Sequence, residues 1–193
     1  MPIRAAATVV LTRASGGGHQ VLMGQRGAGA VFMPSKYVFP GGAVDAADDL
    51  AGPLPLSGDC QRRLALSSPP AALAAAALRE LTEETGLRLR ADRPSLRFIF
   101  RAITPPGRSR RFDARFFLAD AADLLGDAED FSGAEDELSH LHWIGLAEAR
   151  ALDLPFITEV VLAEVSNLMQ GGDQPGVPFF DNSGSVPTFR RIT

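Results

Sequence analysis

Three glutamates stand within five positions in the segment AAALRELTEETGLRL, residues 75–89, which is otherwise rich in alanine and leucine. On an α-helix, Glu80, Glu83 and Glu84 would fall within about 100° of one another, with apolar residues on the opposite side. Several carboxylates on one face offer the oxygen ligands that a hard cation such as Mg²⁺ prefers. Arg79 precedes Glu83 by one turn, where its guanidinium can fix a carboxylate rotamer. The segment suits a metal site, and a solvated helix face is the alternative interpretation.

The helix that would position these residues has signals at both ends. Ser68 is a suitable N-cap, Pro69 fits in the first turn, and Gly86 is a natural C-terminal stop. Before the helix, residues 49–70 are rich in proline, glycine and serine with little periodicity, which predicts an inserted loop. A Pro-Gly-Gly turn at residues 40–42 precedes that insertion and leads into acidic residues.

The rest of the chain predicts strands and helices of an α/β domain over residues 1–172. Apolar, β-branched or aromatic segments predict strands at 3–13, 19–26, 95–106, 110–120 and 141–146. Helical spacing of apolar residues predicts helices over 146–152 and 156–169. The tail, residues 173–193, contains three prolines and two glycines and is predicted to be irregular.

The composition limits the classes of partner. A chain of 193 residues with 46% hydrophobic and 22% charged residues is ordinary for one globular domain. The net charge of -4 argues against a broad basic surface for nucleic acid or an anionic membrane. No segment approaches the ~18 to 20 continuous apolar residues that span a bilayer. Cys60 is the only cysteine, so no intrachain disulfide can form, which suits a cytoplasmic protein.

The order of the glycines and acids resembles the Nudix box, in which a Gly, five residues, a Glu and seven residues precede Arg-Glu-apolar-x-Glu-Glu-x-Gly-apolar. The second half matches at every fixed position from Arg79 to Leu87. The first half departs from the pattern, because Asp48 stands where a Glu would be counted from Gly42. Between Asp48 and Arg79 lie 30 residues rather than seven. Counting back from Arg79 reaches Ala71, so this carboxylate is either supplied by Asp48 across the insertion or absent.

The segments YVFPGGAVDAAD and TPPGRSRRFDARFFLA are similar to the Nudix branch that includes the peroxisomal coenzyme A diphosphatases of animals, which also carries an insertion inside the box. The resemblance covers most of residues 3–168. It implies a Nudix-type α/β/α sandwich with a mixed β-sheet. It also implies metal-dependent hydrolysis of a nucleoside diphosphate linked to a moiety X, with coenzyme A or acyl-coenzyme A as the first substrate. The alternatives are a hydrolase of ADP-ribose, NADH or dinucleotides, or a catalytically silent nucleotide-binding regulator.

The resemblance also assigns roles to residues. The implied ligands of Mg²⁺ or Mn²⁺ are three carboxylates and one main-chain carbonyl, from Glu80, Glu83, Glu84 and Gly42. The implied catalytic set is Arg79, Glu80, Glu83 and Glu137. The general base is either Glu80 or an acid of the stretch GAEDELSHLHW, where Glu137 is preferred over Glu135. A charged surface loop is the alternative for that stretch.

Phosphates that the metal does not cover are expected to meet four arginines: Arg26, Arg108, Arg110 and Arg111. A solvated hairpin connection is the alternative for the segment GRSRRF. His140 and His142 could form a metal pair, but no third ligand is evident, and rim residues are the preferred interpretation. The expected partner is a small nucleoside diphosphate derivative, with no nucleic acid and no membrane, and a homodimer is left open.

Overall fold

The computed structural model describes residues 2–193, and its centre is the long strand β1 (Ile3–Ser15). β1 and β2 (Gly18–Arg26) form the predicted hairpin around the glycine-rich turn. Side chains of β1 alternate between two cores, with Val9 on one face of the sheet and Val10 on the other. This alternation follows from the two-residue period of a strand. β1 therefore contributes to both sides of the molecule.

Within residues 2–193, nine strands join one mixed sheet in the order β3-β2-β1-β6-β5-β8-β9, with β4 beside β1 and β7 beside β2. The other strands are β3 (Tyr37–Val38), β4 (Gly41–Ala43), β5 (Arg97–Ile103), β6 (Arg111–Asp120), β7 (Leu138–Gly145), β8 (Val177–Asp181) and β9 (Thr188–Ile192). β1 runs parallel to β6 along one edge. Along its other edge, β1 pairs first with the glycine-containing β4 and then with β2.

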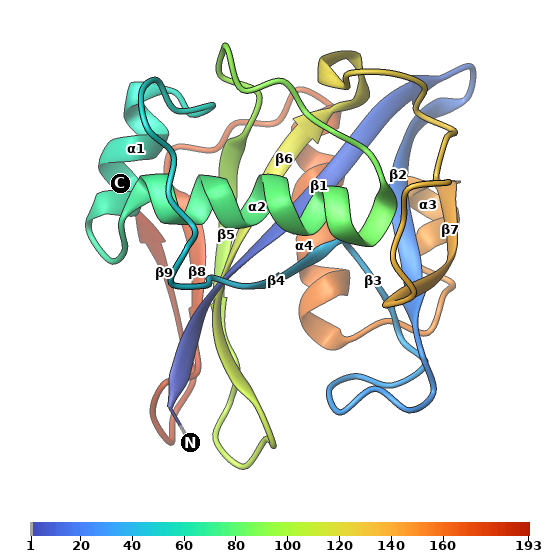
Figure 1. Ribbon diagram of the computed structural model, residues 1–193. Coiled ribbons are helices and arrows are strands. Elements are labelled where there is room, and N and C mark those ends of the chain that lie inside the picture. The colour runs from blue at the N-terminus through green and yellow to red at the C-terminus, as the bar shows by residue number, and fades with distance from the viewer. Residues whose placement is uncertain (1) are drawn as a thin grey trace.

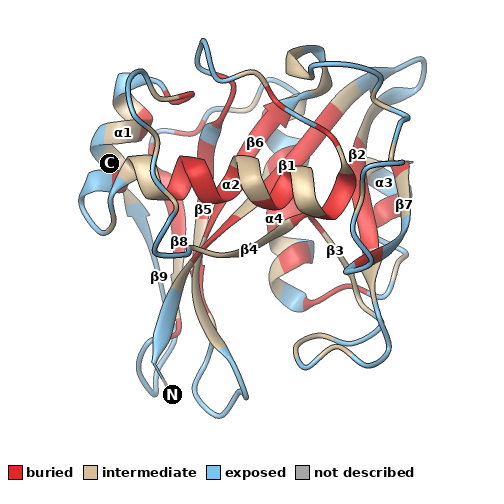
Figure 2. Cartoon of the chain, in the orientation of Figure 1, coloured by how far each residue is buried: buried red, intermediate tan, exposed pale blue. Residues whose placement is uncertain are grey.

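Helices cover both faces of the sheet, so the structure confirms the α/β/α sandwich (Figure 1). The helices are α1 (Gly58–Ala65), α2 (Pro70–Thr85), α3 (Leu146–Ala149) and α4 (Phe156–Met169), with a 3-10 turn η1 (Ala121–Asp123). One buried core lies between α2 and the sheet, and a second lies between the sheet and α4 (Figure 2). Within residues 2–193, no helix combines the length and apolar character needed to cross a bilayer.

The predicted limits of the acidic helix agree with α2. Pro70 occupies its first turn, and the chain reverses at Gly86, whose φ of 77° is left-handed. A left-handed residue at this position is commonly glycine, because no Cβ is present to clash. The cap itself differs in detail, since Pro69 rather than Ser68 stands at the N-cap.

The tail, predicted to be irregular over residues 173–193, instead contains β8 and β9. β8 lies parallel to β5 and pairs with β9 in antiparallel register. Val177 and Phe179 are 0% and 1% exposed. Two apolar residues at alternate positions favour a strand more strongly than the intervening Pro178 opposes it. The prediction was wrong because it treated proline and glycine as turn formers throughout the tail.

The insertion, residues 49–70, is also more regular than predicted. It contains α1, which begins at Ser57, whose hydroxyl accepts a hydrogen bond from the Cys60 backbone N–H. Cys60 and Leu64, one turn apart, are buried in the core beneath α2. The insertion is therefore anchored to the domain by one amphipathic turn, which the sequence signals as an apolar pair at i and i+4.

Candidate active site

The acidic face of α2 points into the protein. Glu80 and Glu84 lie one turn apart and are 9% and 2% exposed, whereas the side chain of Glu83 is 40% exposed. α2 packs on β1 and β4, and the glycines of β4 permit this close approach. A Cβ at Gly42 would lie 2.3 Å from Oε1 of Glu80. The solvated-face alternative is therefore wrong for Glu80 and Glu84.

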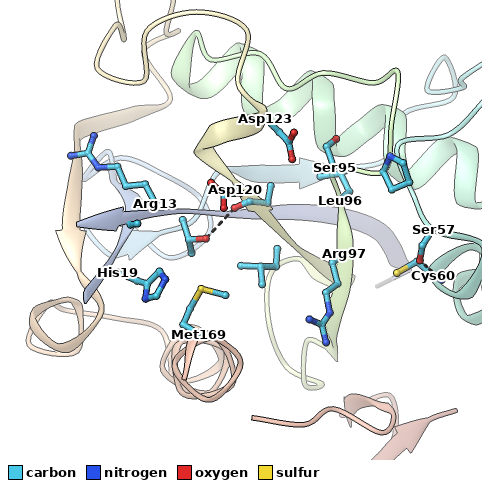
Figure 3. A pocket seen from close by; sticks show the side chains of 15 residues that line it. Arg13, His19, Ser57, Cys60, Ser95, Leu96, Arg97, Asp120, Asp123 and Met169 are labelled. Carbon is cyan, nitrogen blue, oxygen red and sulfur yellow. Dashed lines mark hydrogen bonds between the residues drawn. The ribbon is translucent and has the colours of Figure 1, made fainter. Parts of the chain in front are cut away.

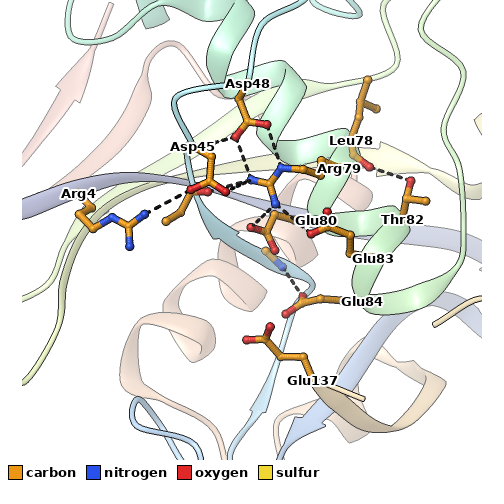
Figure 4. A network of polar contacts seen from close by, with 12 residues as sticks. Arg4, Asp45, Asp48, Leu78, Arg79, Glu80, Thr82, Glu83, Glu84 and Glu137 are labelled. Atoms are coloured by element: carbon orange, nitrogen blue, oxygen red, sulfur yellow. Dashed lines mark hydrogen bonds and ion pairs between the residues drawn. The ribbon is translucent and has the colours of Figure 1, made fainter. Parts of the chain in front are cut away.

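Arg79 holds the acids from both halves of the predicted box. Its Nε and Nη2 donate to the two carboxylate oxygens of Asp48 at 2.9 and 2.8 Å (Figure 4). Nη1 donates to Glu80 Oε1 at 2.9 Å and to Glu83 Oε2 at 3.0 Å. The Arg79 hydrogen bonds lower the pKa of Asp48, so this carboxyl stays ionised. Asp48, which precedes the insertion in the chain, therefore contacts Arg79 of the predicted Nudix box, which follows the insertion.

Two buried carboxyls have raised pKa values. Burial raises the pKa of Glu84 to about 8, although the Gly41 N–H donates to its Oε2 at 2.7 Å. Burial likewise raises the pKa of Glu80, against the opposing hydrogen bond from Arg79. Oε1 of Glu84 is buried and has no hydrogen-bond partner among residues 2–193. An unpartnered buried oxygen in an acidic cluster is suited to a cation or a hydrogen-bond donor.

The cluster contains oxygen atoms that could bind a divalent cation, but these atoms are not arranged around one point as metal ligands are. Across residues 2–193, no three acidic, histidine or cysteine side chains converge on one point that could hold a metal ion. Arg79 binds oxygens of Glu80 and Glu83, so it and a cation would compete for them. The chemistry still fits, because hard divalent ions take carboxylate and carbonyl oxygens. Metal binding by Glu80, Glu83, Glu84 and Gly42 stays a prediction.

A cleft of about 1040 Å³ opens beside the carboxylate cluster. Its lining includes six of the predicted site residues, Gly42, Glu80, Glu137, Arg26, Arg108 and Arg110. Arg111 does not join them, because its guanidinium donates to the main-chain carbonyls of Thr104, Asn182 and Ser183. Arg111 therefore ties β6 to the C-terminal segment, and its expected contact with substrate is not supported by the structure.

The acidic stretch before β7 lies beside the carboxylate cluster. Glu137 accepts a hydrogen bond from Arg26 at 3.0 Å and lies on the same side of α2 as Glu84 (Figure 4). Glu135 contributes its backbone, whose N–H donates to the Glu83 carbonyl at 2.7 Å, while its side chain is exposed. His140 and His142 do not line the cleft, and each Nδ1 contacts a neighbouring oxygen of the protein. The structure favours Glu137 over Glu135 at the cleft.

An apolar wall of the cleft was missed from the sequence. It is formed by side chains of β6, β8, the chain before β4 and the start of α4, including Phe39, Phe116, Leu154, Phe156, Ile157 and Phe180. Phe32 meets Phe112 edge to face near the mouth, with ring centroids 5.3 Å apart. Alternating aromatics at residues 112 and 116 signal a strand, but periodicity does not distinguish a packed core from a cleft wall.

A second pocket of about 390 Å³ lies at the opposite end of β1 and β6 (Figure 3). Two of its charged side chains, Arg13 and Asp123, are engaged in ion pairs. Arg13 pairs with Glu129 and lies over Trp143, and Asp123 pairs with Arg93. Because no carboxylate among residues 2–193 is both unpartnered and buried at this pocket, the cleft beside α2 is the better candidate for chemistry.

Comparison with known proteins agrees with this site. The profile of the NUDIX domain matches residues 69–165, which include α2 and the Glu137 stretch. A NUDIX hydrolase from Alicyclobacillus acidocaldarius superposes with a TM-score of 0.64 at 27% identity, covering 84% of this chain and 90% of the other. No curated protein sequence matches significantly.

Two more distant structures share the fold. The NUDIX domain of Shewanella oneidensis NrtR, solved with ADP ribose, has a TM-score of 0.61 at 15% identity over 88% of this chain and 90% of the other. An Ap4A hydrolase from C. elegans has a TM-score of 0.56 at 18% identity, over 88% and 99%. Domain match, fold and buried acidic helix lead to one conclusion: the chain belongs to the Nudix family and is a hydrolase that acts on pyrophosphate bonds.

Proposed function

We propose that the protein is a divalent-metal-dependent pyrophosphohydrolase that cleaves a nucleoside diphosphate linked to a second moiety X. The products would be a nucleoside monophosphate and phospho-X. The observation that carries the proposal is the buried acidic cluster at the cleft, where Glu84 has one unpartnered oxygen and a pKa of about 8. Such a cluster is costly unless a cation or a proton neutralises it.

The residues of the carboxylate cluster and of the cleft lining have separate roles in the proposed reaction. Mg²⁺ or Mn²⁺, held by Glu80, Glu83, Glu84 and the Gly42 carbonyl, would neutralise phosphate charge and activate a water molecule. Arg79, fixed by Asp48, orients Glu80 and Glu83. Exposed Arg108 and Arg110 bind the phosphates that remain uncovered. Glu137 is the proposed general base, with Glu80 as the alternative.

Coenzyme A or acyl-coenzyme A is the proposed first substrate. The cleft has a charged end at Glu80 and an apolar wall at Phe116, Ile157 and Phe180. Its volume of about 1040 Å³ slightly exceeds the ~300 to 1,000 Å³ common for small-molecule sites, which suits a long substrate with unlike ends. A hydrolase of ADP-ribose, NADH or dinucleotides is the alternative, because the Ap4A hydrolase and the ADP-ribose-bound domain share the fold.

Product analysis tests the proposal directly. The protein would be incubated with coenzyme A, acyl-coenzyme A, ADP-ribose, NADH and dinucleoside polyphosphates, with Mg²⁺, Mn²⁺ or EDTA, and the products identified by mass spectrometry. Metal-dependent release of adenosine 3',5'-bisphosphate and phosphopantetheine supports coenzyme A as substrate. Metal-dependent cleavage of another compound would support the proposed reaction, with that compound as the substrate instead of coenzyme A.

A catalytically silent regulator is the competing function. It is favoured by one observation, that Arg79 already occupies oxygens of Glu80 and Glu83. Thermal stabilisation by a nucleotide of the panel, without any product, would support the regulator and contradict the hydrolase.

A further inference from the structure

The loop that carries Glu137 is attached to the C-terminal end of α2. The Glu135 N–H donates to the Glu83 carbonyl at 2.7 Å, one of the helix-end carbonyls that α2 cannot satisfy itself. Gly133 packs directly on Gly86, where an added Cβ would lie 3.0 Å from the Gly133 backbone. These two contacts fix the loop to the C-terminal end of α2.

On its other side, the loop enters β7 through a β-bulge. Met23 of β2 faces His142, but Gln25 faces Ser139, so β7 carries one extra residue between these pairs. His140 in this bulge has a φ of 49°, which non-glycine residues seldom adopt. Bulges beside functional sites commonly re-aim a side chain. Here the shifted register pairs Leu138 with Arg26, and Leu138 is buried at 5% exposure.

Arg26, at the end of β2, forms an ion pair with Glu137. Its Nη2 donates to Glu137 Oε1 at 3.0 Å, and its side chain is 17% exposed. The backbone of Arg26 is fixed as well, because its N–H donates to the Lys36 carbonyl and its carbonyl accepts from the Ser35 N–H. Arg108 and Arg110 differ, since both are exposed on the loop before β6 and can follow a ligand.

We infer that Arg26 is a positioning residue that holds Glu137 beside the carboxylate cluster, rather than a ligand of the substrate phosphates. This inference rests on the proposed function and makes it more specific. It assigns phosphate binding to Arg108 and Arg110 alone. Removal of Arg26 would release the Glu137 carboxylate from one side, while the Glu135 backbone contact would still hold the loop on the other.

A double-mutant cycle in the proposed reaction tests the inference. Arg26→Gln and Glu137→Gln should each lower kcat about 10- to 100-fold, with KM changed by less than about threefold. The double variant should be no slower than the slower single variant, because both substitutions remove the same arrangement. Arg26→Lys, which keeps a cation for Glu137, should recover part of kcat. A normal kcat with a raised KM in Arg26→Gln, or independent losses in the double variant, would overturn the inference.

Two control variants sharpen the cycle. Arg108→Gln should raise KM and leave kcat nearly unchanged, as expected of a group that binds substrate. Arg13→Gln breaks another arginine-glutamate pair of the β1–β2 hairpin, at the far pocket, and should change neither constant. If kcat falls equally in Arg13→Gln, the effect of Arg26 is one of general stability and the inference fails.

A structural readout separates this inference from the proposed function. If the wild-type protein cleaves nothing in the panel, the proposed function is contradicted, and amide hydrogen exchange then decides about Arg26. Exchange at the Glu135 N–H should be faster in Arg26→Gln than in the wild type, because the loop has lost one attachment. Unchanged exchange would overturn the positioning role.

Discussion

Two arginines organise the core around α2 and do so in opposite ways. Arg79 binds three carboxylates, among them Glu80 of the cleft lining, and the Ala43 carbonyl. Arg115, on β6, is 0% exposed and donates to the Ser67 and Ser68 hydroxyls at 2.9 Å and to the Asp113 carbonyl at 2.7 Å. The first network joins charges, and the second anchors the end of the insertion to the sheet.

The balance of charge separates these networks. Asp48, Glu80 and Glu83 share one arginine, with the buried Glu84 nearby, so acids are in excess beside an open cleft. Arg101 and Arg115 share Asp113, so bases are in excess, and burial lowers the pKa of Arg115 to about 10. In the sealed network, which is the buried one around Arg115, the neutral hydroxyls of Ser67 and Ser68 accept hydrogen bonds from the excess positive charge. The open network, around Arg79, can be neutralised by a soluble cation, which supports the proposal that it is the functional one.

Glu83→Gln should break the functional network with the largest effect. Glu83 is the most exposed of the three helix carboxylates, so removing its charge should cost catalysis more than folding. Turnover should fall by about 10³-fold or more, comparable to the loss of a main electrostatic group. Steady-state kinetics and a thermal melt measure the two effects. Glu159→Gln, an exposed glutamate on α4, is the matched control and should leave both unchanged. Wild-type turnover in Glu83→Gln would contradict the assignment of the site.

Arg115→Met should break the sealed network and leave the chemistry intact. Two serine hydroxyls and the Asp113 carbonyl lose their donor, so the free energy of unfolding should fall by about 3 kcal/mol. Urea denaturation measures this loss, and kcat of the folded variant should stay within about twofold of the wild type. Arg97→Met, at an exposed position of β5, is the control for stability. A large loss of kcat without a loss of stability would mean that the two networks are not separate.

Asp48→Asn tests the link across the insertion. Asparagine cannot give Arg79 the paired charged oxygens that Asp48 supplies, so Arg79 should shift toward Glu80 and Glu83. We expect kcat to fall about 10- to 100-fold, typical for a residue that orients metal ligands. Asp49→Asn, its exposed neighbour, is the control. Equal rates for Asp48→Asn and the wild type would show that the Arg79 contact is dispensable.

Local features of the site were readable from the sequence. The C-terminal stop at Gly86 and the i,i+4 pair of Arg79 and Glu83 depend on neighbours within one helix, whose geometry is known in advance. Apolar periodicity predicted individual strands and helices, again from neighbouring residues. The mixed sheet between helices was implied by the Nudix resemblance, because strand pairing depends on distant contacts that no local pattern shows.

Long-range contacts explain what the sequence did not show. Arg26 meets Glu137 across a separation of 111 residues, and no local pattern signals that β2 and β7 are neighbours. Arg111 resembled Arg108 and Arg110 in the sequence, but the three carbonyls that occupy it come from the chain after β5 and β8. A side chain's availability depends on partners that only the tertiary structure brings near it.

The pH dependence of stability offers the most direct test of the charge excess. The folded-state pKa of Glu84 is raised from the ordinary 4.5 to about 8, so the folded chain binds more protons than the unfolded chain between these values. Stability of the metal-free protein should therefore fall as pH rises through this window, by up to about 1.4 kcal/mol per pH unit, and level off above it. Urea denaturation with EDTA from pH 5 to 9 measures the slope.

Glu84→Gln should lose most of that slope, and a smaller slope of the same sign should remain, because the pKa of Glu80 is raised as well. An equal slope in Glu84→Gln and the wild type would show that Glu84 is not the group whose raised pKa causes the pH dependence. Saturating Mn²⁺ should flatten the wild-type curve, since a cation that binds the ionised cluster stabilises the folded state most where Glu84 is deprotonated. The sealed Arg115 network predicts no such response to Mn²⁺, so stabilisation by Mn²⁺ above pH 8 in the wild type but not in Glu84→Gln would identify the open network as the one that binds a cation.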